Sequence, residues 1–270
     1  MKKQQGLFVP LIIALIAFMS MSITSCLPKA TPAPATMWFH LHTNIDTNEV
    51  DDTSALYRDA NGRRFGLKTA QFLISNVVLR NVNGTTYPIA NAYVLKDIDS
   101  EQYLVGQVPA GTYNGVSFDV GLDNATNALQ PYGFKTIGYV PNTTMWYGNT
   151  TQGYMFMKIQ GFADTTVAQN GTRANALPFS YEIGAEAGIG VIAMPTRGTG
   201  AYSSFPVYPV VAGGVVYVHL ICDYGKLLNG IVFKPGATGF IGDTTDTYNI
   251  NPTLSHAIVN NFNTMFRYEE

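Results

Sequence analysis

The stretch MWFHLH, residues 37–42, alternates between apolar side chains and a set made of Trp38, His40 and His42. Side chains of a β-strand point to opposite faces in turn, so those three share one face of a predicted strand. The Cα atoms of His40 and His42 then stand about 6.5 Å apart, a spacing that lets two imidazoles bind one metal ion. The alternative is a half-buried strand whose polar face carries histidine and a packed indole.

Further segments of this character follow, separated by turns rich in Gly, Pro and Asn. Antiparallel strands with few helices predict an all-β fold, an antiparallel β-sandwich with a few short helices and a C-terminal helix. No linker interrupts residues 37–270, so one domain is expected there. Strands are predicted over 37–45, 70–82, 92–98, 102–107, 113–120, 153–160, 179–183, 190–194, 205–211 and 215–222, and helices over 123–128, 223–228 and 252–266.

The N-terminus predicts export. Lys2 and Lys3 precede an apolar run over 7–21, and small residues lead to Cys26. This arrangement resembles the lipobox of bacterial lipoproteins, in which the cysteine is lipidated. Residues 1–26 are therefore interpreted as a lipoprotein signal peptide and 27–36 as a Pro/Ala/Thr tether. An uncleaved membrane anchor is the alternative; the lipoprotein interpretation predicts a cell-envelope location, at the outer membrane.

Only Cys222 is left once Cys26 carries lipid. An exported domain with one cysteine has no internal disulfide, so a large core must stabilise it. The apolar run around Cys222 predicts a buried thiol, with a soft metal ligand as the alternative.

Composition limits the function classes. Charged residues make up 13% of the chain and the formal net charge is -2, which argues against nucleic-acid binding. The sequence has no nucleophile elbow, phosphate-binding glycine loop or Cys-x-x-Cys motif. We therefore expect a protein that is not an enzyme, because an enzyme needs a pocket with paired titrating groups.

Four segments in order resemble the MbnP-like family of secreted copper-associated proteins, and the likeness extends from Met37 to Tyr268. The Pro-Ala-Gly-Thr-Tyr turn in one of them is common in exported β-domains, so the order of all four carries the resemblance. They are Phe39-His40-Leu41-His42, FLISNVVL (72–79), VPAGTY (108–113) continuing to Asp123, and Met145-Trp146 followed by GYMFMKIQG (153–161).

The resemblance implies a β-sandwich, an envelope location and bound copper. A family motif with a histidine matches residues 179–184 here, with Glu182 in the histidine's place. Carboxylate is a harder ligand than imidazole and suits Cu(I) poorly. Related copper proteins use histidines beside a tryptophan that a dihaem peroxidase oxidises to kynurenine, which implies a possible peroxidase partner and a role for Trp38.

We expect His42 and His40 as the first metal ligands, with His219, Glu182 and Trp38 as further members of the site. His256, in the predicted C-terminal helix, is expected to be exposed. The predicted function is a lipid-anchored envelope protein that binds copper without turnover. The alternative is a structural or ligand-binding surface lipoprotein that keeps the sandwich and has no metal.

Overall fold

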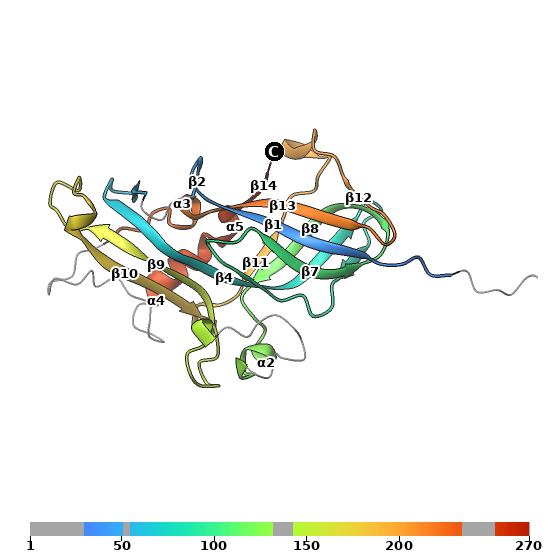
Figure 1. Cartoon of the computed structure of the whole chain (residues 1–270), viewed down its shortest axis with the longest axis horizontal. Coiled ribbons are helices and arrows are strands. Elements are labelled where there is room, and N and C mark those ends of the chain that lie inside the picture. The colour runs from blue at the N-terminus through green and yellow to red at the C-terminus, as the bar shows by residue number, and fades with distance from the viewer. Residues whose placement is uncertain (1–29, 51–54, 132–142, 234–251, 270) are drawn as a thin grey trace, which may run out of the picture. The chain divides into compact units, whose positions relative to one another are not determined.

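Strand β1 (Ala35–Ile45) has the alternating burial that its sequence predicts: Phe39 and Leu41 are buried, whereas His40 and His42 are half-buried on the opposite face. The computed structural model describes residues 30–50, 55–131, 143–233 and 252–269 (Figure 1). The predicted signal peptide and the first part of the tether lie outside the described residues. Residues from Ala33 onward form one compact unit.

The first sheet contains β1 and positions the polar face of the opening stretch. Its order is β14-β13-β1-β2, and β7 also pairs with β1. β1 and β13 run parallel, which departs from the predicted antiparallel pattern, while the other pairs in this sheet are antiparallel. Its other strands are β2 (Asn48–Glu49), β7 (Gln102–Val108), β13 (Val215–Asp223) and β14 (Phe266–Tyr268).

The second sheet has nine strands and is antiparallel in every pair. Its central strand β4 (Arg64–Asn81) is 18 residues long and bends at register shifts, one of them beside Asn76, which has a φ of 51°. The order is β10-β9-β4-β8-β11, with β12 on β8 and β3, β5 and β6 on β4. The remaining strands are β3 (Tyr57–Arg58), β5 (Thr86–Pro88), β6 (Val94–Lys96), β8 (Gly111–Val120), β9 (Met155–Asp164), β10 (Ala176–Gly184), β11 (Gly190–Ala193) and β12 (Tyr208–Val210).

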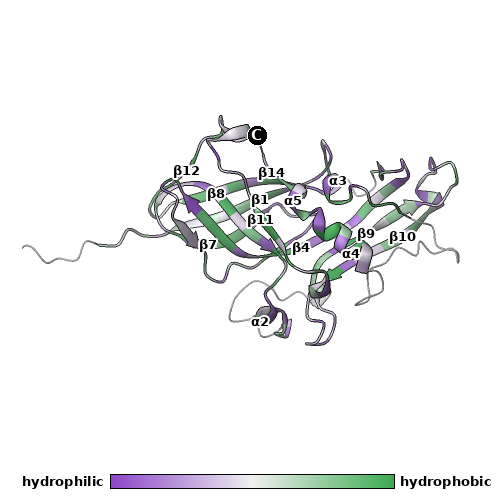
Figure 2. Cartoon of the chain, turned by 180° about the vertical axis from the view of Figure 1, so that it is seen from behind, coloured by the Kyte–Doolittle hydropathy of each residue, from purple (hydrophilic) through white to green (hydrophobic). Residues whose placement is uncertain are grey.

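The inner faces of the two sheets form one hydrophobic core. The ring of Phe39 on β1 lies 5.7 Å from that of Phe118 on β8, and Phe118 lies 5.0 Å from Phe266 on β14. Figure 2 shows hydrophobic and hydrophilic residues alternating along the strands. The predicted β-sandwich is confirmed.

The helices are short. Aspartates cap two of them: Asp123 accepts from backbone N–H groups at the start of α2 (Asn124–Asn127), and Asp223 does so for α3 (Tyr224–Leu227). The predicted helix over 252–266 is two helices, α4 (Pro252–Asn260) and α5 (Phe262–Met265). The prediction was wrong at Phe266, which is extended and begins β14 because its ring fills the core between the sheets. None of the described helices is long and apolar enough to cross a membrane.

Candidate metal site

Three histidines meet on the outer face of the first sheet. His40 and His42 come from β1 and His219 from β13, where the parallel register places His219 directly beside His40. The Nδ1 atoms of His40 and His219 are 2.8 Å apart. The ring centroid of His40 is 4.4 Å from that of His42 and 4.7 Å from that of His219.

Three glutamates surround these imidazoles, each on a segment that adjoins β1 or β13. Glu49 lies on β2, Glu101 precedes β7, and Glu269 follows β14. The Leu41 amide donates to the Glu101 carbonyl, and the Glu269 amide donates to the carbonyl of His219. Backbone pairing therefore fixes the position of each carboxylate beside the histidines.

The carboxylate contacts join the six side chains, which we call the histidine–glutamate cluster. Glu101 Oε2 lies 2.9 Å from His40 Nε2, Glu49 Oε1 2.6 Å from His42 Nδ1 and Glu269 Oε2 3.1 Å from His219 Nδ1. Its members are His40, His42, His219, Glu49, Glu101 and Glu269.

The cluster shifts the pKa values of His42 and Glu101. Burial lowers the pKa of His42, but the hydrogen bond to Glu49 and the charges of Glu269 and Glu101 outweigh it, so the pKa is raised above its ordinary value. The pKa of Glu101 is lowered, first by the hydrogen bond from His40, against an opposing effect of burial. Imidazolium–carboxylate attraction thus stabilises the cluster without a metal.

The donor set fits a metal ion. His42 Nε2 is buried and has no hydrogen-bond partner among the described residues, although Glu269 Oε1 is 3.3 Å away. Two groups of three ligand atoms lie within 4.8 Å of one another: His40, His219 and Glu269, and His40, His42 and Glu101. Metal–nitrogen bonds of about 2.0–2.1 Å require only small movements of these side chains. An ion would also use the buried lone pair of His42.

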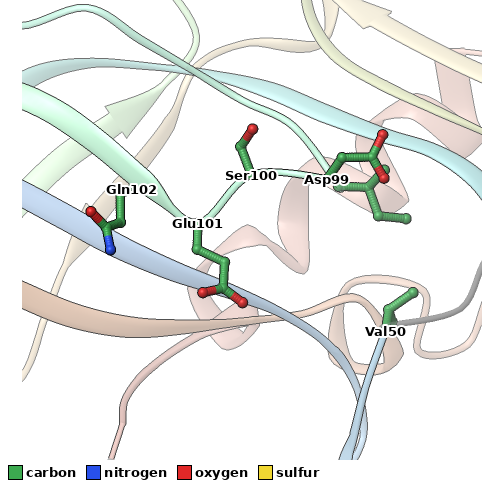
Figure 3. A pocket seen from close by; sticks show the side chains of 6 residues that line it. Val50, Asp99, Ser100, Glu101 and Gln102 are labelled. Atoms are coloured by element: carbon green, nitrogen blue, oxygen red, sulfur yellow. The ribbon is translucent and has the colours of Figure 1, made fainter.

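One hollow borders the cluster at Glu101, and a second lies beside Trp38. Figure 3 shows the larger, a cavity of about 630 Å³ that Glu101 shares with Val50, Asp99, Ser100 and Gln102; the Glu101 side chain projects toward β1. This cavity opens one side of Glu101 to solvent. A second hollow of about 300 Å³ has a mostly apolar lining that includes Trp38, Tyr103 and Leu104.

Trp38 lies on the same face as the cluster, two residues before His40. Its ring stacks on that of Tyr217 on β13, with centroids 6.5 Å apart and planes at 28°. The indole therefore forms, with Tyr217, an aromatic surface on the same face as the site.

Glu182 lies elsewhere. It is on β10 in the second sheet, 3.6 Å from Lys158 Nζ, and it accepts a hydrogen bond from the Ser180 hydroxyl. The structure brings His40, His42, His219 and Trp38 together on one face and does not bring Glu182 to them. His256 is exposed on α4, as predicted.

Sequence reasoning missed Glu49, Glu101 and Glu269. No short motif links these three residues to the histidines. The one usable signal is strand pairing, because residues at the ends of the strands that flank β1 and β13 meet the outer face of the sheet. This signal can be used only once β13 is known to be the parallel partner of β1.

Comparison with known proteins gives one family. A sequence model of the MbnP family matches residues 34–242. Among solved structures, MbnP from Methylosinus trichosporium is similar, with 16% sequence identity and a TM-score of 0.46 over 78% of this chain and 84% of that chain. No curated protein sequence matches the chain.

Proposed function

The chain belongs to the MbnP family, and from the histidine–glutamate cluster we propose that it is a lipid-anchored cell-envelope protein that binds copper without turnover. The observation that carries the proposal is the convergence of three of the chain's four histidines on one solvent-facing patch. Imidazole nitrogens suit both oxidation states of copper.

The carboxylates favour a divalent ion. The neutral form of each imidazole binds metal, and three nearby glutamates supply negative charge that attracts and compensates a cation. Zinc accepts the same donor types, but Cu(II) binds a given set of nitrogen and oxygen ligands more tightly than Zn(II). Copper is therefore the expected ion at this site when both are present at equal concentration.

The remaining parts of the proposal come from the sequence. Cys26 would carry the lipid, and the signal peptide would direct the domain to the envelope, at the outer membrane. The absence of catalytic motifs supports a binding role in metal acquisition or handling. A dihaem peroxidase partner and oxidation of Trp38 to kynurenine stay predictions from the family resemblance.

The test is a copper titration of the metal-free protein, with Cu(II) and Cu(I) each competed against a chelator. We expect one tight site, and His40→Ala, His42→Ala or His219→Ala should each weaken it by more than the roughly 10–100-fold loss typical of a residue that only supports a ligand. His256→Ala, the exposed fourth histidine, is the matched control and should leave the affinity unchanged.

Two results would contradict copper binding: no stoichiometric uptake by the wild type, or equal affinity in the His40→Ala, His42→Ala double variant. Either result favours the alternative, a metal-free surface lipoprotein in which imidazolium–carboxylate pairs serve only to stabilise the sheet. That alternative has a specific basis, since the described contacts already pair the cluster internally.

A further inference from the structure

Some loop segments at one end of the sandwich lack charged side chains, and they are bordered by Arg80, which pairs with Thr86, and by Arg197, whose guanidinium lies over the Tyr208 ring. Four segments meet there, and none contains Asp, Glu, Lys or Arg. We call this end the uncharged tip. Its segments are 33–36, 82–86, 108–112 and 211–215.

Backbone hydrogen bonds join the segments of the uncharged tip. The Val82 amide donates to the Thr112 carbonyl over 3.0 Å, and Pro209 lies opposite Thr112 where β12 pairs with β8. The Gly213 amide donates to the Ala33 carbonyl over 3.1 Å. The tip is thus one contiguous surface, at the end of the sandwich where β12 lies in Figure 1.

Valines project from the uncharged tip into solvent. Val211 is 71% exposed, Val215 61% and Val82 50%. The opposite end of the sheets differs, because Asp46 follows β1 there and Glu49 lies on the adjoining β2. Exposed valines gathered on a surface without charge are expected where a protein meets an apolar partner.

The chain enters the domain at this tip. Six residues separate Cys26 from Ala33, and three of residues 27–36 are prolines, so an extended tether spans at most about 20–25 Å. A lipid on Cys26 therefore holds the tip, and not the charged end, within that distance of the bilayer. Tethering at such short range gives the tip a high effective concentration at the lipid surface.

We infer that the uncharged tip rests on the lipid bilayer, with Val82, Val211 and Val215 inserted among the headgroups. This orientation depends on the lipid anchor proposed above. The bilayer is the occupant that both the tether length and the lack of charge favour. Without the lipid anchor, nothing would favour a membrane over another protein as the partner of this tip.

The orientation places the copper site in water. His40 lies four residues along β1 from Thr36 and His42 six, so the histidine–glutamate cluster stands about 13–20 Å above the tip. It opens on the side of the sandwich, where a soluble metal donor or acceptor reaches it without contacting lipid.

The test is lipid quenching at two matched positions. The full-length lipidated protein, purified in detergent, is reconstituted into phosphatidylethanolamine and phosphatidylglycerol vesicles that contain a doxyl-labelled lipid. A thiol-reactive fluorophore is attached at Val215→Cys or at the control Val191→Cys. Val191 is 65% exposed on β11, beside Asp119 near the far end of β8, and the buried Cys222 stays unlabelled.

We expect loss of most of the fluorescence at position 215 and none at 191, and Val211→Asp should reduce the loss at 215. Two results would contradict contact between the tip and the bilayer while leaving the proposed lipid anchor unaffected. They are equal quenching at both positions, and no quenching at position 215 in protein that floats with the vesicles. If the protein does not float with the vesicles, the lipid anchor is contradicted, and with it the contact of the tip with the bilayer. A concentration-dependent signal at 215 without lipid would identify a second copy of the chain as the occupant and also overturn the inference.

Discussion

His42 has the densest negative surroundings in the histidine–glutamate cluster. Its Nδ1 lies 2.6 Å from Glu49 Oε1 and 3.4 Å from Glu101 Oε1, and its Nε2 lies 3.3 Å from Glu269. These carboxylates raise the pKa of His42, so under the proposed function a proton would compete with the metal for this imidazole at a higher pH than usual. A single side chain would thus couple charge, stability and metal binding.

Copper affinity should therefore fall with decreasing pH from a point above 6.5, the unperturbed pKa of histidine. Glu49→Gln removes the hydrogen-bonding carboxylate, lowers the pKa of His42 and should shift the onset to lower pH. The apparent dissociation constant measured across this range tests the shift. Glu182→Gln, on the other sheet, is the control; an equal shift there would contradict the role of Glu49.

In the metal-free protein, the contribution of His42 to the free energy of unfolding should increase with decreasing pH, whereas copper affinity decreases. A folded-state pKa raised above the unfolded value stabilises the fold fully below the unfolded pKa, and this stabilisation is lost as pH rises through the folded pKa. Without copper, the His42 contribution to the free energy of unfolding is thus lost in the pH range where copper binding strengthens.

At the scale of elements, the parallel pairing of β1 with β13 is secured at its far end. Asp223 is the last residue of β13. Its carboxylate accepts hydrogen bonds from the amides of Gly225 and Lys226, which caps α3, and from the amide of Asp46 after β1. A Cβ at Gly225 would lie 2.6 Å from the Asp46 side chain, so the close approach requires glycine. Asp223 therefore joins the ends of two strands that are far apart in sequence.

Asp223→Ala should lower the free energy of unfolding by about 1–3 kcal/mol, since it removes a helix cap and the acceptor of the partly buried Asp46 amide. Asp223→Asn keeps an acceptor oxygen and should cost less. Urea denaturation measures both. Asp123→Ala is the comparison, because Asp123 caps α2 without joining strands; an equal loss in the two alanine variants would show that the bond to Asp46 contributes nothing.

Sequence reasoning was accurate where local side-chain alternation decides the structure. The face shared by Trp38, His40 and His42 followed from period-two patterning, and the short helices predicted over 123–128 and 223–228 are present as α2 and α3. Phe266 was assigned to a helix because apolar spacing fits both a helix and a short core strand. The parallel partner of β1, and with it the three glutamates, depends on contacts between distant segments that no local pattern encodes.

At the scale of the molecule, stability comes from a shared core and not from covalent cross-links in the described part of the chain. Cys222 is free and fully buried, and burial raises the pKa of its thiol to about 12. Methionines 145, 155 and 157 are buried. The domain therefore needs no oxidising partner to fold.

The midpoint of thermal unfolding should be unchanged by a thiol reductant, and Cys222 should react with a thiol reagent only when the protein unfolds, because the thiolate is the reactive form. Mass spectrometry after native and denaturing labelling measures this. Val191→Cys provides an exposed thiol that should react in the folded protein. Labelling of Cys222 at the same rate as position 191 would contradict the buried location.

The pairing of His40 with His219 spans 179 residues, and Glu269 comes from the strand end beyond both. No fragment made early in synthesis holds this donor set, and folds that depend on contacts between such distant segments form slowly. Copper loading would thus have to wait until the whole domain has assembled. A chain exported before it folds would then bind its metal only in the compartment where it works. The topology would thus determine in which compartment the protein acquires the metal.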